Sequence, residues 1–189
     1  MSQFHRTFIA IKIKPEPELL DLMVVCRENF NNEAIKWVDE NNLHLTLKFL
    51  GNTSSNQTEE IKNILEEFAV GVPAFSFALK GLGYFKSKGK PRVLFASIYS
   101  FKAMEKIAGE LEEQLFKLGF EKETRAFKPP LTLARIKFVK DKNHFYEFVG
   151  QYKNKKFQTV NVSEIIFYQS ILKPQGPKYV PLKTIQLNS

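Results

Sequence analysis

"ENNLHLTLKFL", residues 40–50, alternates apolar and polar side chains, which is typical of a β-strand with one buried face. Its Leu-Thr-Leu centre returns in "FKPPLTLARIK", residues 127–137. When the two centres are aligned, the second copy has Pro130 where the first has His44. The sequence therefore predicts two equivalent strands, of which only the first carries a histidine.

Alternation assigns the side chains of each copy to two faces. In the first copy it predicts a polar face of His44, Thr46 and Lys48 and a core face of Leu45, Leu47 and Phe49. In the second copy it places Arg135 on the face of Leu131 and Leu133, away from Thr132, unless the strand ends or twists first. An imidazole beside a hydroxyl can transfer a proton and hydrogen-bond a phosphate oxygen. One such pair can arise by chance, and the repetition is what favours a functional interpretation.

The chain around these strands repeats a plan of strands followed by a helix. Apolar periodicity predicts strands at 6–13, 34–38, 44–50, 74–83, 92–99, 157–162, 164–172 and 179–186, besides the second Leu-Thr-Leu strand. It predicts helices ending near Phe30, following Ser54, spanning about 104–118 and spanning about 142–151. We expect an α+β fold with an internal duplication, built as one bilobal domain over residues 1–189, with the repeated motifs at 44–47 and 130–133.

Composition fits a folded globular chain. The 189 residues are 43% hydrophobic, enough for one substantial core. No stretch approaches the roughly 18 apolar residues that span a bilayer, and the N-terminal residues do not read as a leader, so we expect a cytoplasmic protein. Cys26 lies on the apolar stripe of a predicted helix and is interpreted as a core thiol. The absence of heptads argues against a coiled coil, and we expect a monomer.

The formal charge of +8 favours phosphate-bearing ligands without choosing among RNA, nucleotides and anionic lipid. The densest basic segment is "FKSKGKPR", residues 85–92, which by itself reads as a solvated hairpin connection. Several aromatic side chains could stack on a base, although with 18 Phe in the chain each is more often part of a core. These candidates are Phe8, Trp37, Phe49, Phe95 and Tyr168.

The chain resembles the two-histidine phosphoesterases, which carry paired His-x-Thr-x motifs, and within them the RNA 2′,3′-cyclic phosphodiesterase (2′-5′ RNA ligase) branch. The specific blocks are "HLTLKFLG" at 44–51 and "LTLAR" at 131–135. Corroborating blocks are "RTFIAI", "PRVLFA" and "FYQSILKPQGPKYVPL". The resemblance implies antiparallel sheets around a central cleft, with helices on the outer faces.

The resemblance also implies roles for individual residues. His44 matches the general acid, Thr46 and Thr132 match the threonines that hold the phosphate, and Arg135 matches the arginine after the second motif. No cofactor or metal is implied. The implied partners are RNA ends or nucleotides with 2′,3′-cyclic or 2′-5′ phosphodiesters, with no membrane contact.

Pro130 departs from the pattern at the position of the general base. Proline can neither accept nor donate a proton, yet it is tolerated at the first residue of a strand. We therefore expect the fold to persist while turnover is impaired. His5 and His144 are the only other histidines, and an ordinary solvated or capping role is expected for each.

Three functions remain open from the sequence. The first is a slow phosphodiesterase, or one with an unidentified base, and the second is a non-catalytic binder of RNA ends or nucleotides in the same cleft. The third is a basic protein that binds nucleic acid along an extended face, for which binding should grow with RNA length and fall steeply with salt.

Overall fold

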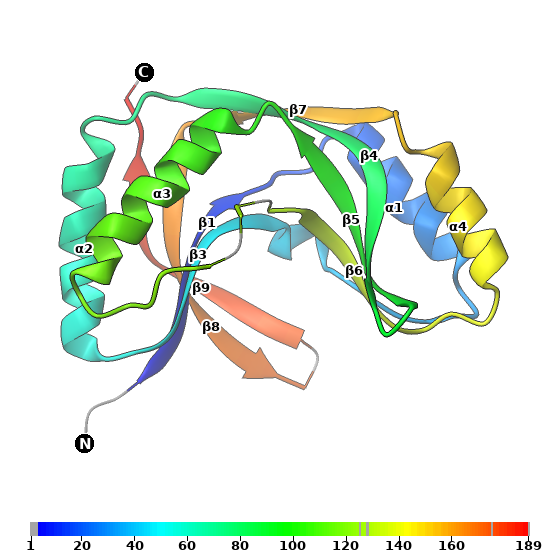
Figure 1. Ribbon diagram of the computed structural model, residues 1–189, viewed down its shortest axis with the longest axis horizontal. Coiled ribbons are helices and arrows are strands. Elements are labelled where there is room, and N and C mark those ends of the chain that lie inside the picture. Colours follow the sequence, from blue (N-terminus) through cyan, green and yellow to red (C-terminus); the bar gives the residue numbers. More distant parts are fainter. Residues whose placement is uncertain (1–3, 125, 128, 175, 189) are drawn as a thin grey trace.

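The computed structural model describes residues 4–124, 126–127, 129–174 and 176–188, which form nine strands, four α-helices and a short 3-10 helix (Figure 1). The helices are α1 (Pro17–Asn29), α2 (Ser55–Ala69), α3 (Lys102–Phe116) and α4 (Lys142–Gln151), and the 3-10 helix is Glu40–Asn42. The strands are β1 (His5–Lys12), β2 (Ala34–Trp37), β3 (His44–Thr53), β4 (Phe75–Ser87), β5 (Lys90–Tyr99), β6 (Leu131–Phe138), β7 (Lys156–Val162), β8 (Glu164–Lys173) and β9 (Gly176–Gln186).

The strands form two antiparallel sheets. The first sheet has the order β3-β1-β8-β9 and the second the order β2-β6-β5-β4-β7. Helices α2 and α3 contact the first sheet, whereas α1 and α4 contact the second (Figure 1). The expected α+β class with antiparallel sheets and outer helices is confirmed, and every expected strand and helix is present.

Local sequence signals explain where the elements begin and turn. Helix α2 starts with a capping box, in which Ser54 accepts from the Gln57 backbone N–H and the Gln57 side chain accepts from the Ser54 N–H. Helix α1 has proline at its first position, where no N–H is needed. The β4–β5 hairpin turns at Lys88 and Gly89, whose φ angles of 50° and 71° suit a two-residue turn.

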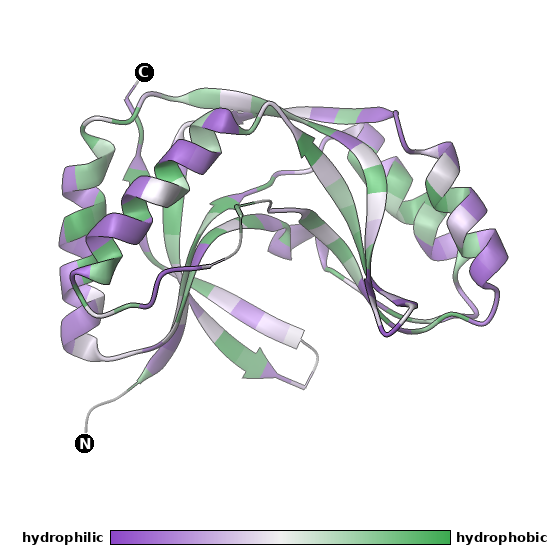
Figure 2. Ribbon diagram, viewed as in Figure 1, coloured by the Kyte–Doolittle hydropathy of each residue, from purple (hydrophilic) through white to green (hydrophobic). Residues whose placement is uncertain are grey.

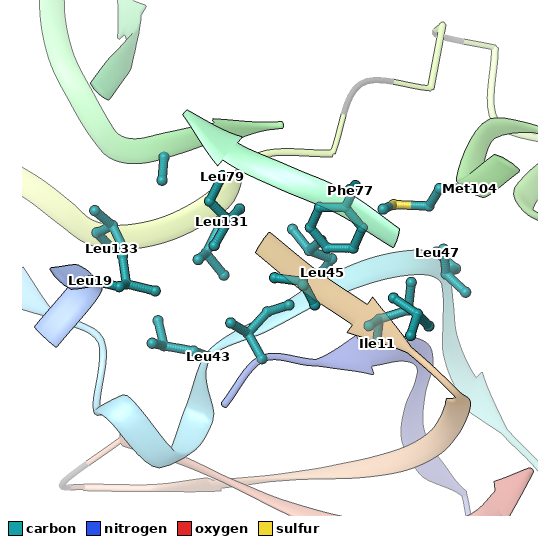
Figure 3. Packing of buried hydrophobic residues seen from close by; sticks show 14 of the residues in the cluster. Ile11, Leu19, Leu43, Leu45, Leu47, Phe77, Leu79, Met104, Leu131 and Leu133 are labelled. Atoms are coloured by element: carbon teal, nitrogen blue, oxygen red, sulfur yellow. The ribbon is translucent and has the colours of Figure 1, made fainter. Parts of the chain in front are cut away.

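The hydrophobic core joins both Leu-Thr-Leu strands. Leu45 and Leu47 of β3 lie in the same buried cluster as Leu131 and Leu133 of β6 (Figure 3). Hydrophobic and hydrophilic residues alternate along the strands and around the helices (Figure 2), and the buried hydrophobic side chains form the core. Cys26 is fully buried, and burial raises the pKa of its thiol to about 12, which confirms its interpretation as a core residue.

Both Leu-Thr-Leu strands carry a β-bulge at their second leucine. In β3, Thr46 pairs with Ala10 and Lys48 with Ile9, so Leu47 has no partner in the register. In β6, Thr132 pairs with Phe95 and Ala134 with Leu94, so Leu133 is skipped in the same way. A bulge inserts one residue and reverses the alternation beyond it.

The bulges overturn the expected faces. Lys48 is buried on the core side, whereas Phe49 is 70% exposed on the side of His44 and Thr46, the reverse of strict alternation. Arg135 is likewise exposed and shares the face of Thr132 rather than that of Leu131 and Leu133. Phe49 and Arg135 therefore occupy equivalent places, three residues after the two threonines.

None of the helices in the described part of the chain is long and apolar enough to cross a membrane.

Candidate functional site

His44 begins β3 with its imidazole fixed by the backbone. Its Nδ1 lies 2.7 Å from the carbonyl oxygen of Asn42. Because a carbonyl oxygen only accepts, Nδ1 carries the proton and donates it, which leaves Nε2 as the nitrogen that can take up or release a proton. The Asn42 side chain donates in turn to the carbonyl of Pro177 in β9, 3.2 Å away. The tautomer and position of His44 are therefore set by the neighbouring backbone.

The protonation of His44 reflects burial and charge. Burial lowers its pKa from the ordinary 6.5, the hydrogen bond to Asn42 partly opposes this, and the positive charge of Arg135 lowers it further. The imidazole is therefore predominantly neutral at neutral pH. The coupling also shows that Arg135, from the second sheet, lies within electrostatic reach of His44 in the first.

Aromatic rings surround His44 on the first sheet. Its ring centroid lies 5.1 Å from that of Phe8 and 4.9 Å from that of Tyr179. Tyr168 stacks on Phe8 at 5.2 Å. Burial raises the pKa of Tyr179, while the charges of Arg135 and Arg6 act in the opposite direction. Tyr179 therefore faces the same region as His44 and Arg135.

The residues singled out in the sequence come from β3, the edge strand of the first sheet, and from β6, which lies between β2 and β5 in the second. His44 and Thr46 share one face of β3, and Thr132 and Arg135 share one face of β6. Strands β3 and β6 contact each other, which brings the two motifs together although they belong to different sheets. Both threonines are half-buried.

Pro130 immediately precedes β6 and is half-buried. It therefore stands where a proline removes no ladder hydrogen bond, as expected for the first position of a strand. Both remaining histidines have contacts of their own in other parts of the fold. His5 bonds through Nδ1 to Gln169 Nε2 at 2.7 Å, and His144 in α4 packs against Phe30, 5.5 Å between ring centroids.

Sequence reasoning missed three features of this region. Asn42 was not singled out, although a residue just before a strand histidine is placed to hold its ring. The role of Tyr179 was also missed, because its approach to His44 depends on the pairing of β8 with β9. The bulges were missed because the residue pattern within Leu-Thr-Leu does not indicate them.

A pocket lies beside this region. It has a volume of about 1120 Å³ and is lined by residues of β3 and α3, by Gln57, and by residues 119–124, 126–127 and 129. Thr46 and Phe49 border it, whereas His44, Thr132 and Arg135 do not. Lys48 is one of its lining residues, and its Nζ lies 2.6 Å from Glu112 Oε1 and donates to the Glu121 carbonyl. We place the candidate site at His44, because Arg135 of the other sheet acts on the pKa of His44 and Tyr179 packs against its ring.

The aromatic residues that were candidates for stacking on a base differ in how accessible they are. Phe8 and Tyr168 are buried, and Trp37 packs against the main core. Phe49 is exposed and Phe95 half-buried, so these two retain accessible ring surface. In the described residues no cluster of three His, Cys, Asp or Glu side chains could hold a metal ion.

Known proteins are similar to this chain over nearly all of its length. An RNA 2′,3′-cyclic phosphodiesterase of Methanocaldococcus jannaschii is 34% identical over 94% of this chain and 98% of its own length. Another, from Thermotoga maritima, is 34% identical over 96% of this chain and 95% of its own.

Solved structures show the same fold. A protein of Thermus thermophilus superposes with a TM-score of 0.77 at 26% identity, covering 96% of this chain and 97% of the other. LigT of Escherichia coli in complex with 3′-AMP superposes with a TM-score of 0.75 at 23% identity, covering 99% of this chain and all of LigT.

The sequence profile of the LigT-like phosphoesterases matches residues 11–95 and 101–179. With both halves of the chain matched, this protein belongs to the LigT-like phosphoesterase family.

Proposed function

We propose that this protein acts on RNA ends as a 2′,3′-cyclic phosphodiesterase or 2′-5′ RNA ligase-like protein, and that it works slowly because Pro130 occupies the place of the general base. One observation supports the proposal most directly. His44 from one sheet and Arg135 from the other lie close enough for the charge of Arg135 to lower the pKa of His44. The curated relatives bear the name RNA 2′,3′-cyclic phosphodiesterase, and LigT has been solved with 3′-AMP, which supports a nucleotide ligand.

In this proposal the two motifs form opposite walls of a central cleft in one bilobal, internally duplicated domain. The hydroxyls of Thr46 and Thr132 donate to the phosphate oxygens, and Arg135 neutralises the phosphate charge. A bound phosphate offsets the effect of Arg135 on His44 and raises its pKa toward the range in which Nε2 carries a proton.

The proposed hydrolysis needs one proton at the leaving oxygen. Water attacks phosphorus, the bond to one ribose oxygen breaks, and His44 Nε2–H protonates that oxygen as it leaves. With proline at position 130, the proton of the attacking water passes to solvent. Loss of a general base costs typically ~10²–10⁴ in rate, so turnover should be slow rather than absent.

A second candidate function follows from the same proline. The chain could bind RNA ends or nucleotides through Thr46, Thr132 and Arg135 without turnover. Pro130 favours this candidate because no described histidine stands in for the missing base, His5 and His144 being held elsewhere.

The deciding experiment is hydrolysis of an oligonucleotide ending in a 2′,3′-cyclic phosphate by the native chain, Pro130→His and His44→Ala. We expect slow native turnover, loss of turnover in His44→Ala and a gain of about a hundredfold or more in Pro130→His. If only Pro130→His turns over, the native chain is a binder. If His44→Ala is as active as the native chain, the assignment of the general acid is wrong.

The pH profile of the native chain tests the absence of a base. Hydroxide attack rises tenfold per pH unit, while the protonated fraction of His44 falls tenfold per unit above its pKa. The rate should therefore rise with pH and become level above the pKa of His44 in the RNA complex. A bell-shaped profile would require a second titrating group and would contradict our account of Pro130.

A further inference from the structure

We propose that the face of the second sheet beside Thr132 binds the nucleotides that precede the RNA end, stacking them on Phe95 and Phe85 toward the basic β4–β5 turn. This inference rests on the proposed function, since it extends the substrate from a terminal nucleotide to a single-stranded RNA segment.

Strand pairing places the two rings beside the phosphate-binding residues. Phe95 of β5 pairs directly with Thr132, and Val93 pairs with Arg135 on one side and Phe85 on the other. Partners in an antiparallel pair point to the same face of a sheet. Thr132, Arg135, Phe95 and Phe85 therefore line one continuous surface.

That surface is the face of the second sheet turned away from helix α4. Tyr84, which points to the opposite face from Phe85, packs against Phe145 and Tyr146 of α4. Phe85 remains 48% exposed. A large aromatic side chain left half uncovered beside phosphate-binding residues is available to stack on a base.

The two rings form a preformed platform. Their centroids lie 4.5 Å apart, and Phe95 lies so close over Gly83 that a Cβ there would be 2.5 Å from the ring. Any side chain at position 83 would displace Phe95. The glycine therefore allows the Phe95 ring to lie close to the strand backbone.

Positive charge lies at the far end of the platform. Segment 75–99, which forms the hairpin, contains no Asp or Glu. Lys86 lies over the rings of Tyr84 and Tyr146 on the α4 side, and Arg92 donates to the Lys137 carbonyl. Lys88 and Lys90 are exposed at the turn, where they can neutralise backbone phosphates.

Single-stranded RNA is the occupant that fits this combination. Rings next to a cationic track bind successive bases without sequence preference, each stacked base strengthening binding by roughly five- to a hundredfold. A purely structural pair of rings would support the sheet and leave RNA affinity unchanged.

The test compares dissociation constants for a nucleoside 2′,3′-cyclic phosphate and a tetranucleotide with the same end, at one salt concentration. We expect the native chain to bind the tetranucleotide more tightly. Phe85→Ala should weaken tetranucleotide binding by roughly five- to a hundredfold and leave the mononucleotide unchanged. Phe116→Ala is the matched control, because Phe116 is similarly exposed, at 55%, but lies on α3 beside the other sheet.

A second pair of measurements tests the turn and separates this inference from the proposed function. Replacing Lys88 and Lys90 together by Gln should reduce the slope of log affinity against log salt for the tetranucleotide by up to about 1.4. Equal losses for both ligands in Phe85→Ala, or no gain from length in the native chain, would overturn the inference while leaving end recognition intact. If a tetranucleotide with a plain 3′-hydroxyl binds as well as the cyclic form, recognition of the RNA end is contradicted. Stacking of the preceding nucleotides on Phe85 and Phe95 is not contradicted by that result.

Discussion

The charge of Arg135 reaches His44 across the boundary between the two sheets. It depresses the pKa of His44, in addition to the larger effect of burial. In the sequence these residues are separated by most of β3, two helices and two strands, and alternation alone would have turned Arg135 away. The pKa of His44 can therefore be used to test whether the two motifs lie next to each other.

Replacing Arg135 by Gln should raise the pKa of His44, because it removes a positive charge that disfavours the protonated imidazole. Burial remains, so the pKa should stay below its ordinary value of 6.5. The measurement is an NMR titration of the His44 ring protons. As a control, Arg92→Gln on β5, the strand next to β6, should leave the pKa of His44 unchanged. An identical titration in native and Arg135→Gln protein would show that the two motifs do not meet as described.

At the scale of elements, the bulges in β3 and β6 decide which side chains reach the site. One bulge turns Arg135 outward beside Thr132, and the other turns Lys48 inward. Once buried, Lys48 needs partners, and it finds Glu112 of α3 and the carbonyl of Glu121. The ion pair thus joins β3 to α3 and to the segment that leads toward β6.

Glu112→Gln should lower the free energy of unfolding by about 2 to 3 kcal/mol, because it leaves the buried Lys48 ammonium without its counter-charge. Lys48 is only 7% exposed and Glu112 17%. The neighbouring pair of Glu113 and Lys122 is 66% and 42% exposed, so Glu113→Gln should cost less than about 1 kcal/mol. Urea denaturation of the two variants measures the difference. Similar costs would mean that the Lys48 pair is solvated rather than buried.

At the scale of the whole molecule, the chain passes repeatedly between the sheets. Strand β1 belongs to the first sheet, β2 to the second, β3 to the first, β4 to β7 to the second, and β8 and β9 to the first. One buried cluster contains residues from both sheets. Neither sheet can therefore be completed by a contiguous half of the chain.

Unfolding in urea should be a single transition, since each sheet depends on segments from both halves. Trp37 is the only tryptophan and lies on β2, so its fluorescence follows the second sheet. Far-UV circular dichroism follows all four helices, including α2 and α3 on the first sheet. The two signals should share one midpoint. Separate midpoints would indicate that the sheets unfold independently.

The sequence by itself determined the secondary structure and singled out the candidate site residues. Periodicity is local, so the alternation in "HLTLKFL" and the helical stripes following Ser54 and near Met104 each predict an element within a few residues of its bounds. The repeated Leu-Thr-Leu and the resemblance it carries singled out His44, Thr46, Thr132 and Arg135, whose roles stay predictions.

Tertiary structure alone decided which faces these residues occupy and what surrounds them. The bulges at Leu47 and Leu133 arise from how β3 pairs with β1 and β6 with β5, so no pattern within either strand encodes them. The approach of Tyr179 and Arg135 to His44, and hence its lowered pKa, depends on contacts between segments far apart in the chain. Electrostatics and burial act through space, whereas periodicity acts along the sequence, and that difference separates what could be predicted from what could not.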